Sequence, residues 1–169
     1  MNYFELFNIP ISFYPDLKHL KTKFYELSRK FHPDFFTQEN ETDQLDALEM
    51  SSLVNKAYKV FQSHDDTIKY VLQLNGMMEE DEKYVLPSDF LMDMMDLNEQ
   101  LMEATMEINH AEIEKVKQGI ATKQHEIELP VKSLMEDYKD GENNQQYLGL
   151  IKEYYFKKKY LNRILATIA

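Results

Sequence analysis

Residues 16–34, DLKHLKTKFYELSRKFHPD, carry the signals of one amphipathic helix and of its end. Asp16 can cap the start of the helix, because its side chain can accept backbone N–H groups of the first turn. Pro33 disfavours helical geometry at His32. The pattern therefore predicts a helix over about 17–31, followed by a polar loop over 32–41. The apolar residues of this predicted helix recur at helical spacing: Leu17, Leu20, Phe24, Leu27 and Phe31.

The flanking segments predict that this helix belongs to a compact helical unit over residues 1–76. A short helical segment is expected over residues 3–9. A shorter helix with Ile68, Val71 and Leu72 ends at Asn75-Gly76, a typical helix stop. Between them a second long helix starts at about Thr42, with an apolar face of Ala47, Met50, Val54, Ala57, Tyr58 and Phe61.

The second half of the chain predicts a three-helix bundle over residues 88–169, after an acidic linker over 77–87. Ser88 is expected to cap a helix that runs to about Asn109, with a core stripe of Phe90, Met94, Leu97, Leu101, Ala104 and Ile108. A helix over about 110–139 contains Pro130, which we expect to kink it. A final helix over about 144–168 has an expected core stripe of Tyr147, Leu150, Tyr154, Leu161, Leu165 and Ile168.

The composition limits the fold and the chemistry. Only four glycines are present, and their spacing excludes a Walker loop, a dinucleotide-binding fingerprint and a G-x-S-x-G elbow. Few glycines and long helical periodicity predict an all-α protein. The absence of cysteine excludes disulfides, thiolate metal sites and a cysteine nucleophile. No apolar run approaches the roughly 18 residues of a membrane-spanning helix. The N-terminus also lacks a secretory signal pattern, so we expect a cytoplasmic protein that does not contact membranes.

The charge is acidic overall and unevenly distributed. The net charge of −11, from 30 acidic and 19 basic residues, argues against nucleic-acid binding. Residues 79–114 contain 12 acidic residues and 1 basic residue. Residues 17–31 have the opposite bias, because Glu26 is their only acidic residue. The sequence therefore predicts two binding surfaces of different charge.

The sharpest motif is His32-Pro33-Asp34, which lies between the basic helix and a helix with VNKAY at residues 54–58. This arrangement resembles the J-domain of DnaJ-type co-chaperones. Three further features make the resemblance more specific: NYFELF at residues 2–7, IKYVL at 68–72 and the helical second half. The whole chain is similar to the HscB family of iron–sulfur cluster assembly. That resemblance implies an N-terminal four-helix J-domain followed by a C-terminal three-helix bundle.

The resemblance implies a first partner at the N-terminal end. In such proteins the J-domain docks on an HscA/DnaK-type heat-shock chaperone and stimulates its ATP hydrolysis. His32, Pro33 and Asp34 are then the essential turn, and the basic helix faces an acidic groove on the ATPase. Exposed cations steer association more than they add affinity. The candidate cations are Lys18, Lys21, Lys23, Arg29 and Lys30.

The helix that starts at Ser88 has an additional apolar–acidic face, because five of the ten methionines lie in it. Such a face is typical of a partner site, and packing against another part of the chain is the alternative. The resemblance implies that it binds an IscU-like iron–sulfur scaffold, with help from an aromatic residue of the last helix. The positions implied are Leu91, Met92, Met95, Asp96, Glu99, Glu103 and Phe156.

The expected function is that of a co-chaperone with no active site, cofactor or metal of its own. It would deliver the scaffold to the chaperone and trigger ATP hydrolysis there. One alternative is a J-domain adaptor for a different client. A remote alternative is a helical-bundle metal enzyme, which in ferritin-like proteins needs two Glu-x-x-His motifs. This chain has one such motif, Glu107-Ile108-Asn109-His110, at a helix junction.

Overall fold

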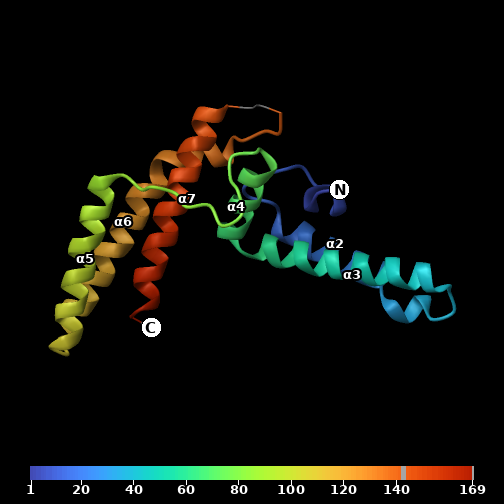
Figure 1. Cartoon of the computed structure of the whole chain (residues 1–169), viewed down its shortest axis with the longest axis horizontal. Helices are drawn as coiled ribbons and strands as arrows, with labels where there is room; N and C mark the ends of the chain where they lie inside the picture. The colour runs from blue at the N-terminus through green and yellow to red at the C-terminus, as the bar shows by residue number, and fades with distance from the viewer. Residues whose placement is uncertain (142–143, 169) are drawn as a thin grey trace. The chain divides into compact units, whose positions relative to one another are not determined.

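The computed structural model describes residues 1–141 and 144–168. Within them the chain forms seven α-helices and one 3-10 turn and no strand, which confirms the predicted all-α class. The chain divides into two compact units. The N-terminal unit comprises residues 1–74 and 138–141 of the described chain, and the C-terminal unit comprises residues 75–137 and 144–168. Figure 1 follows the chain through the elements of both units.

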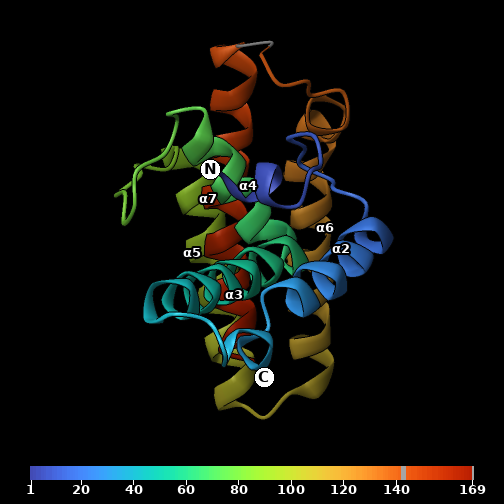
Figure 2. The ribbon, with the colours of Figure 1, turned by 90° about the vertical axis from the view of Figure 1, so that its right-hand side faces the viewer.

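The N-terminal unit contains a pair of antiparallel helices, α2 (Leu17–Lys30) and α3 (Glu41–Gln62), joined through the 3-10 turn η1 (Pro33–Phe36). The short α1 (Tyr3–Leu6) and α4 (His64–Leu74) complete it, and Figure 2 shows α2 beside α3. The ring of Phe61 contacts the rings of Phe4 and Phe7, at centroid distances of 4.9 and 5.4 Å. A cluster of buried aromatic rings therefore joins α1 to the end of α3 within the core of this unit.

The predicted limits of α2 are confirmed. Oδ1 of Asp16 accepts the N–H groups of Lys18 and His19, at 2.9 and 3.3 Å. The helix ends at Lys30, and Phe31 follows as its C-terminal cap. The predicted apolar face is wrong at Leu17, which is 65% exposed. The reason is that α2 meets α3 further along, where Phe24 stacks on Tyr58 at 4.0 Å.

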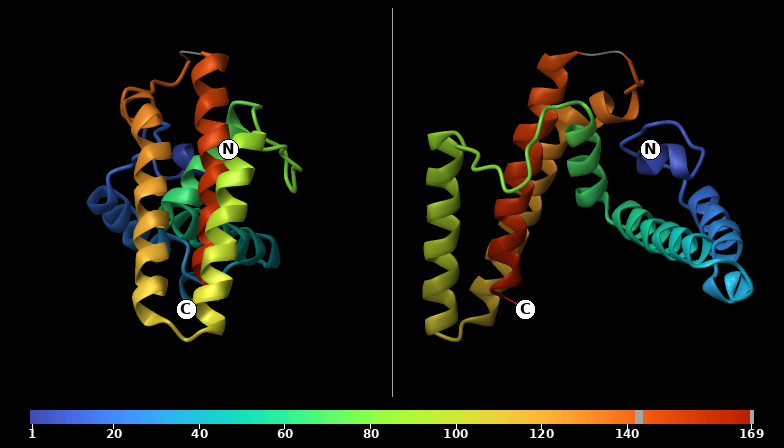
Figure 3. Two further views of the ribbon diagram at one scale, coloured as in Figure 1. Left: turned by 90° about the vertical axis from the view of Figure 1, so that its left-hand side faces the viewer. Right: turned by 45° about the vertical axis from the view of Figure 1, so that its right-hand side comes forward.

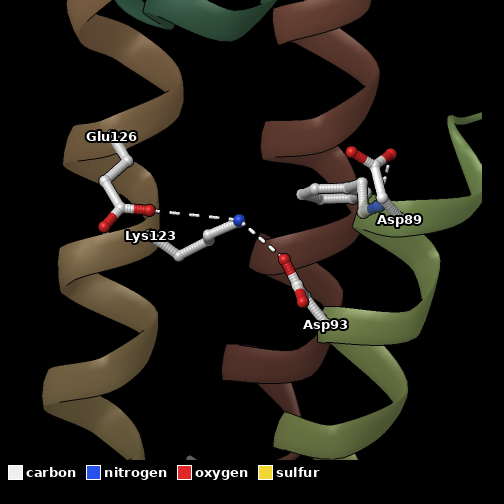
Figure 4. Close-up of polar contacts among 5 residues, drawn as sticks. Asp89, Asp93, Lys123 and Glu126 are labelled. Atoms are coloured by element: carbon white, nitrogen blue, oxygen red, sulfur yellow. Dashed lines mark hydrogen bonds and ion pairs between the residues drawn. The ribbon is translucent and has the colours of Figure 1, made fainter.

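The C-terminal unit is a bundle of α5 (Ser88–Met106), α6 (His110–Glu136) and α7 (Gln145–Ala166), which Figure 3 shows side by side. Lys123 Nζ lies 3.0 Å from Asp93 Oδ2 and 3.9 Å from Glu126 Oε2, and thereby joins α6 to α5 (Figure 4). The bundle core buries residues of all three helices: Phe90, Met94, Leu101, Val116, Ile120, Leu161 and Ile164.

The predicted boundaries of α5 need two corrections. Ser88 is the first helical residue and makes no capping bond, because Pro87 occupies the cap position. The helix ends at Met106, and Ile108 is exposed with φ of +52° instead of contributing to the core. The chain turns at Ile108 so that Asn109 Oδ1 can accept the N–H of Glu112, at 3.3 Å, and cap α6.

The predicted core stripe of α7 is wrong in its first half. Tyr147 and Leu150 are exposed, while Leu148 and Ile151 are buried. Since α7 is apolar on several sides, periodicity alone leaves its rotation about the helix axis open. Packing against α6 selects the face that is buried.

Candidate partner-binding surfaces

The His32-Pro33-Asp34 turn is exposed and locally ordered by its own hydrogen bond. The backbone N–H of Asp34 donates to His32 Nδ1 at 3.3 Å, so the imidazole acts as the N-terminal cap of η1. Because Nδ1 already accepts this N–H, the 3.6 Å separation between Nδ1 and Asp34 Oδ2 reflects proximity, not a second hydrogen bond. The Asp34 side chain is 85% exposed, which leaves its carboxylate open to a partner.

The five candidate cations of α2 differ in their surroundings. Within the described chain, no acidic group lies within ion-pair distance of Lys18 or Lys21, and both are exposed. Lys23 pairs with Glu26 at 3.2 Å, and Lys30 Nζ lies 5.2 Å from the centroid of the Phe31 ring. Arg29 Nε donates to the backbone carbonyl of Tyr25 at 3.4 Å. Lys18 and Lys21 are therefore the two cations most available to an acidic partner.

The structure adds apolar residues that the sequence analysis did not select. A groove of about 500 Å³ begins at Pro33 and Asp34 and continues along α3, where Leu45 and Leu48 line it. Both leucines are more than half exposed. Their signal in the sequence was weak, because a leucine in an amphipathic helix is most simply assigned to the core. The groove places an apolar surface directly beside the exposed turn.

The apolar–acidic face of α5 is exposed in the C-terminal unit. Met92 and Met95 are 65% and 66% exposed. In the part of the chain that the structure describes, no cation lies within ion-pair distance of the three carboxylates on this face, those of Asp96, Glu99 and Glu103. Asp93, by contrast, is neutralised by Lys123. Within the C-terminal unit, the alternative in which this face packs against another helix does not hold.

The methionine stripe of α5 continues beyond the implied scaffold positions. Met102 and Met106 are exposed and, together with Asn98, Leu101, Thr105 and Thr167, line a groove of about 400 Å³. Met95, Met102 and Met106 share one side of the helix, since they recur at spacings of seven and four residues. The exposed apolar surface therefore extends along most of α5.

Phe156 of α7 is half-buried, although it is not one of the expected core residues of the last helix. Its ring stacks on Tyr84 with a centroid distance of 4.6 Å and an interplanar angle of 3°. Tyr155 meets it edge-on at 5.1 Å. One face of this candidate residue is thus covered by a residue of the same unit.

The described residues also bear on the alternatives. They contain no group of three or more His, Asp or Glu residues placed to hold a metal ion. Glu107 caps the end of α5 and His110 begins α6, so the single Glu-x-x-His motif spans a turn instead of one helix face. In the same described ranges, no helix is long and apolar enough to cross a membrane.

Comparisons with known proteins place the chain in a family. A family model described as the HSCB C-terminal oligomerisation domain matches residues 86–169. The mouse iron-sulfur cluster co-chaperone protein HscB is 35% identical over 136 residues, which cover 80% of this chain and 57% of the mouse protein. A co-chaperone protein HscB homolog of Vibrio cholerae serotype O1 is 38% identical over 106 residues, 62% of each chain. The matches span less than two thirds of the length of these relatives.

Solved structures agree along nearly the whole chain. The crystal structure of human co-chaperone protein HscB superposes with a TM-score of 0.80 at 30% identity, over 99% of this chain and 80% of the human one. Chaperone HscB from Vibrio cholerae gives a TM-score of 0.71 at 27% identity, over 99% and 97%. These relatives define the class as that of all-helical co-chaperones, not of enzymes. The chain belongs to the HscB co-chaperone family.

Proposed function

We propose that the chain binds an IscU-like iron–sulfur scaffold, delivers it to an HscA/DnaK-type heat-shock chaperone and stimulates that chaperone's ATPase. The observation that carries the proposal is the pair of exposed surfaces of different charge, one in each unit, in a member of the HscB family. The chain itself contributes contacts and no catalysis, so it needs no cofactor or metal. We further propose that it acts in the cytoplasm.

The chaperone end is the N-terminal unit, acting as a J-domain. Its exposed His32-Pro33-Asp34 turn stands next to a helix with two unpaired exposed lysines, Lys18 and Lys21. Such cations would attract an acidic groove on the ATPase and accelerate encounter. The groove that continues from the turn along Leu45 and Leu48 supports an apolar contact in the same interface.

The scaffold end is the exposed face of α5. Methionine side chains adapt to the shape of a partner, and the unpaired carboxylates beside them favour a partner whose apolar contact residues are surrounded by lysine or arginine. Met92 and Met95 are the centre of this face, since both are about two-thirds exposed and lie among the acidic residues. The name of the mouse relative, an iron-sulfur cluster co-chaperone, agrees with a cluster scaffold as the client.

The deciding experiment uses one variant to separate scaffold binding from stimulation of the chaperone's ATPase. Met92→Ala combined with Met95→Ala removes two central contacts, and we expect affinity for a purified IscU-like scaffold to fall by at least roughly 30-fold. Stimulation of the chaperone's ATPase by the variant alone should stay at the wild-type level. Calorimetry and a steady-state ATPase assay measure the two quantities.

Leu129→Ala is the matched control, because Leu129 is equally exposed but lies on α6. Its scaffold affinity should equal that of the wild type. Unchanged scaffold affinity in the double methionine variant would instead favour the adaptor for a different client. Loss of both activities, with a lowered unfolding temperature, would show that the substitutions damage the bundle.

A further inference from the structure

The segment over residues 77–87, expected from sequence to be an acidic linker, is fixed to the bundle at two points. Met78 is buried, and Leu86 packs against the core cluster of the C-terminal unit. Lys152 Nζ of α7 lies 2.7 Å from Glu82 Oε2, and these two side chains are only 18% and 22% exposed. The segment is thus held on the bundle by the ion pair of Glu82 with α7 and by the apolar contact of Leu86 with the core cluster.

Tyr84 lies within this fixed segment and covers one face of Phe156. The two rings are parallel within 3°, with their centroids 4.6 Å apart. Lys152 Nζ lies 5.7 Å from the centroid of the Tyr84 ring. Burial raises the pKa of the Tyr84 hydroxyl, with smaller contributions from Glu153 and Glu82. Tyr84 is therefore an ordered part of the bundle surface.

One helical turn separates Phe156 from a ring contact between α7 and α5. Tyr160, one turn further along α7, lies on the same helix face as Phe156 and meets the ring of Phe90 at a centroid distance of 6.3 Å. Phe90 directly precedes Leu91 and Met92 in α5. The stacked pair of Tyr84 and Phe156 thus lies in the same unit as the face to which the proposed function assigns the scaffold, one turn of α7 away from a contact with the start of α5.

We propose that Tyr84 is a positioning residue of the scaffold-binding surface, which holds the Phe156 ring in the orientation that the scaffold contacts. The inference rests on the proposed function together with the scaffold contact that the family resemblance implies for Phe156. A half-exposed phenylalanine without this stack would sample several rotamers and lose that freedom on binding, whereas a ring already held loses less. Because Glu82 and Leu86 both anchor the segment, the scaffold would bind to the stack and not displace it.

The test uses the full chain and a purified IscU-like scaffold. We expect Tyr84→Ala to weaken binding by roughly 5- to 10-fold, mainly through faster dissociation. Tyr84→Phe keeps the stacked ring and should stay within about 2-fold of the wild type. Tyr84→Leu keeps an apolar side chain larger than alanine but has no flat ring. Its binding should be weakened as much as that of Tyr84→Ala, which separates loss of the stack from any loosening of the segment by alanine. Tyr147→Ala, at the exposed start of α7, is the control and should bind normally.

A double-mutant cycle tests whether Tyr84 acts on scaffold binding through Phe156. If Tyr84 acts through Phe156, then Tyr84→Ala combined with Phe156→Ala should bind no more weakly than Phe156→Ala alone. Additive losses, or normal binding by Tyr84→Ala when Phe156→Ala is impaired, would overturn the inference. Tighter binding by Tyr84→Ala would also overturn it, because Tyr84 would then cover the binding surface instead of supporting it. Normal binding by Phe156→Ala would overturn it as well. None of these results affects the proposed function, which depends on the separate double methionine variant.

Discussion

His32 Nδ1 accepts the backbone N–H of Asp34 at 3.3 Å, while the carboxylate of the same Asp34 points to solvent with its side chain 85% exposed. The imidazole therefore orders the turn, and Pro33 between the two residues restricts the backbone further. The carboxylate has no role in holding the unit together, which leaves it available for a partner.

This division of roles predicts the effect of Asp34→Asn. We expect the variant to lose at least roughly tenfold in stimulation of an HscA/DnaK-type ATPase, because the neutral amide cannot replace an anion in a charge-assisted hydrogen bond. The unfolding temperature should not change. Steady-state ATP hydrolysis and thermal unfolding measure both, and Asp46→Asn on the exposed side of α3 is the control. Normal stimulation by Asp34→Asn would contradict the assignment of the turn.

Charge reversal on α2 should lower the rate at which the protein associates with the chaperone. Lys18→Glu combined with Lys21→Glu removes the two cations that lack an acidic neighbour in the described chain. We expect the association rate at low salt to fall about tenfold, and the difference to shrink as salt screens the interaction. Stopped-flow or surface-based kinetics at several salt concentrations measure this. Lys132→Glu, exposed on α6, should associate like the wild type, and an equal slowing in that control would indicate a non-specific effect of net charge.

The aromatic core of the N-terminal unit should dominate its stability. Phe61→Ala removes a buried ring that contacts the rings of Phe4 and Phe7. Loss of burial together with the cavity left behind should lower the free energy of unfolding by about 3–5 kcal/mol. Phe35→Ala, at a position that is 71% exposed, should change it by less than about 0.5 kcal/mol. Urea denaturation compares the two, and similar losses would show that the core lies elsewhere.

Tyr70 should make the free energy of unfolding depend on pH in the alkaline range. Its hydroxyl accepts the N–H of Tyr3 at 2.9 Å, and burial raises the pKa of Tyr70 above the ordinary value of 10.0. The neutral phenol is thus favoured in the folded state. Its contribution to stability is fully present below about pH 10 and is lost as the pH rises through the raised pKa.

Tyr70→Phe tests this dependence. At neutral pH the variant should lose about 1 kcal/mol with its hydrogen bond. Above about pH 10 its free energy of unfolding should fall less steeply than that of the wild type, since phenylalanine does not titrate. Denaturation curves across this pH range give both numbers. Tyr25→Phe, exposed on α2, should follow the wild-type curve; identical slopes in all three proteins would contradict the assignment to Tyr70.

The sequence was sufficient where structure depends on near neighbours. The cap at Asp16, the end of α2 before Pro33 and the stop at Gly76, where φ is +69°, all follow from the backbone preferences of a few residues. The exposed turn and the methionines of α5 were found for the same reason, since a motif and a helical period are local properties. Prediction failed at Leu17, whose burial depends on where α2 meets α3, and at Ser88 and Ile108, where the bounds of α5 differ from those expected.

At α7 and at residues 77–87, what the sequence determines differs most clearly from what the tertiary structure decides. Sequence by itself determined an all-helical chain, the basic and acidic surfaces and the aromatic identity of residue 156. Only the tertiary structure decided that Leu148 and Ile151 are buried in place of Tyr147 and Leu150, and that Tyr84 covers Phe156. Tyr84 and Phe156 are 72 positions apart in the chain. No local preference encodes such a contact, which arises because helix packing and the Glu82–Lys152 ion pair bring the two rings together.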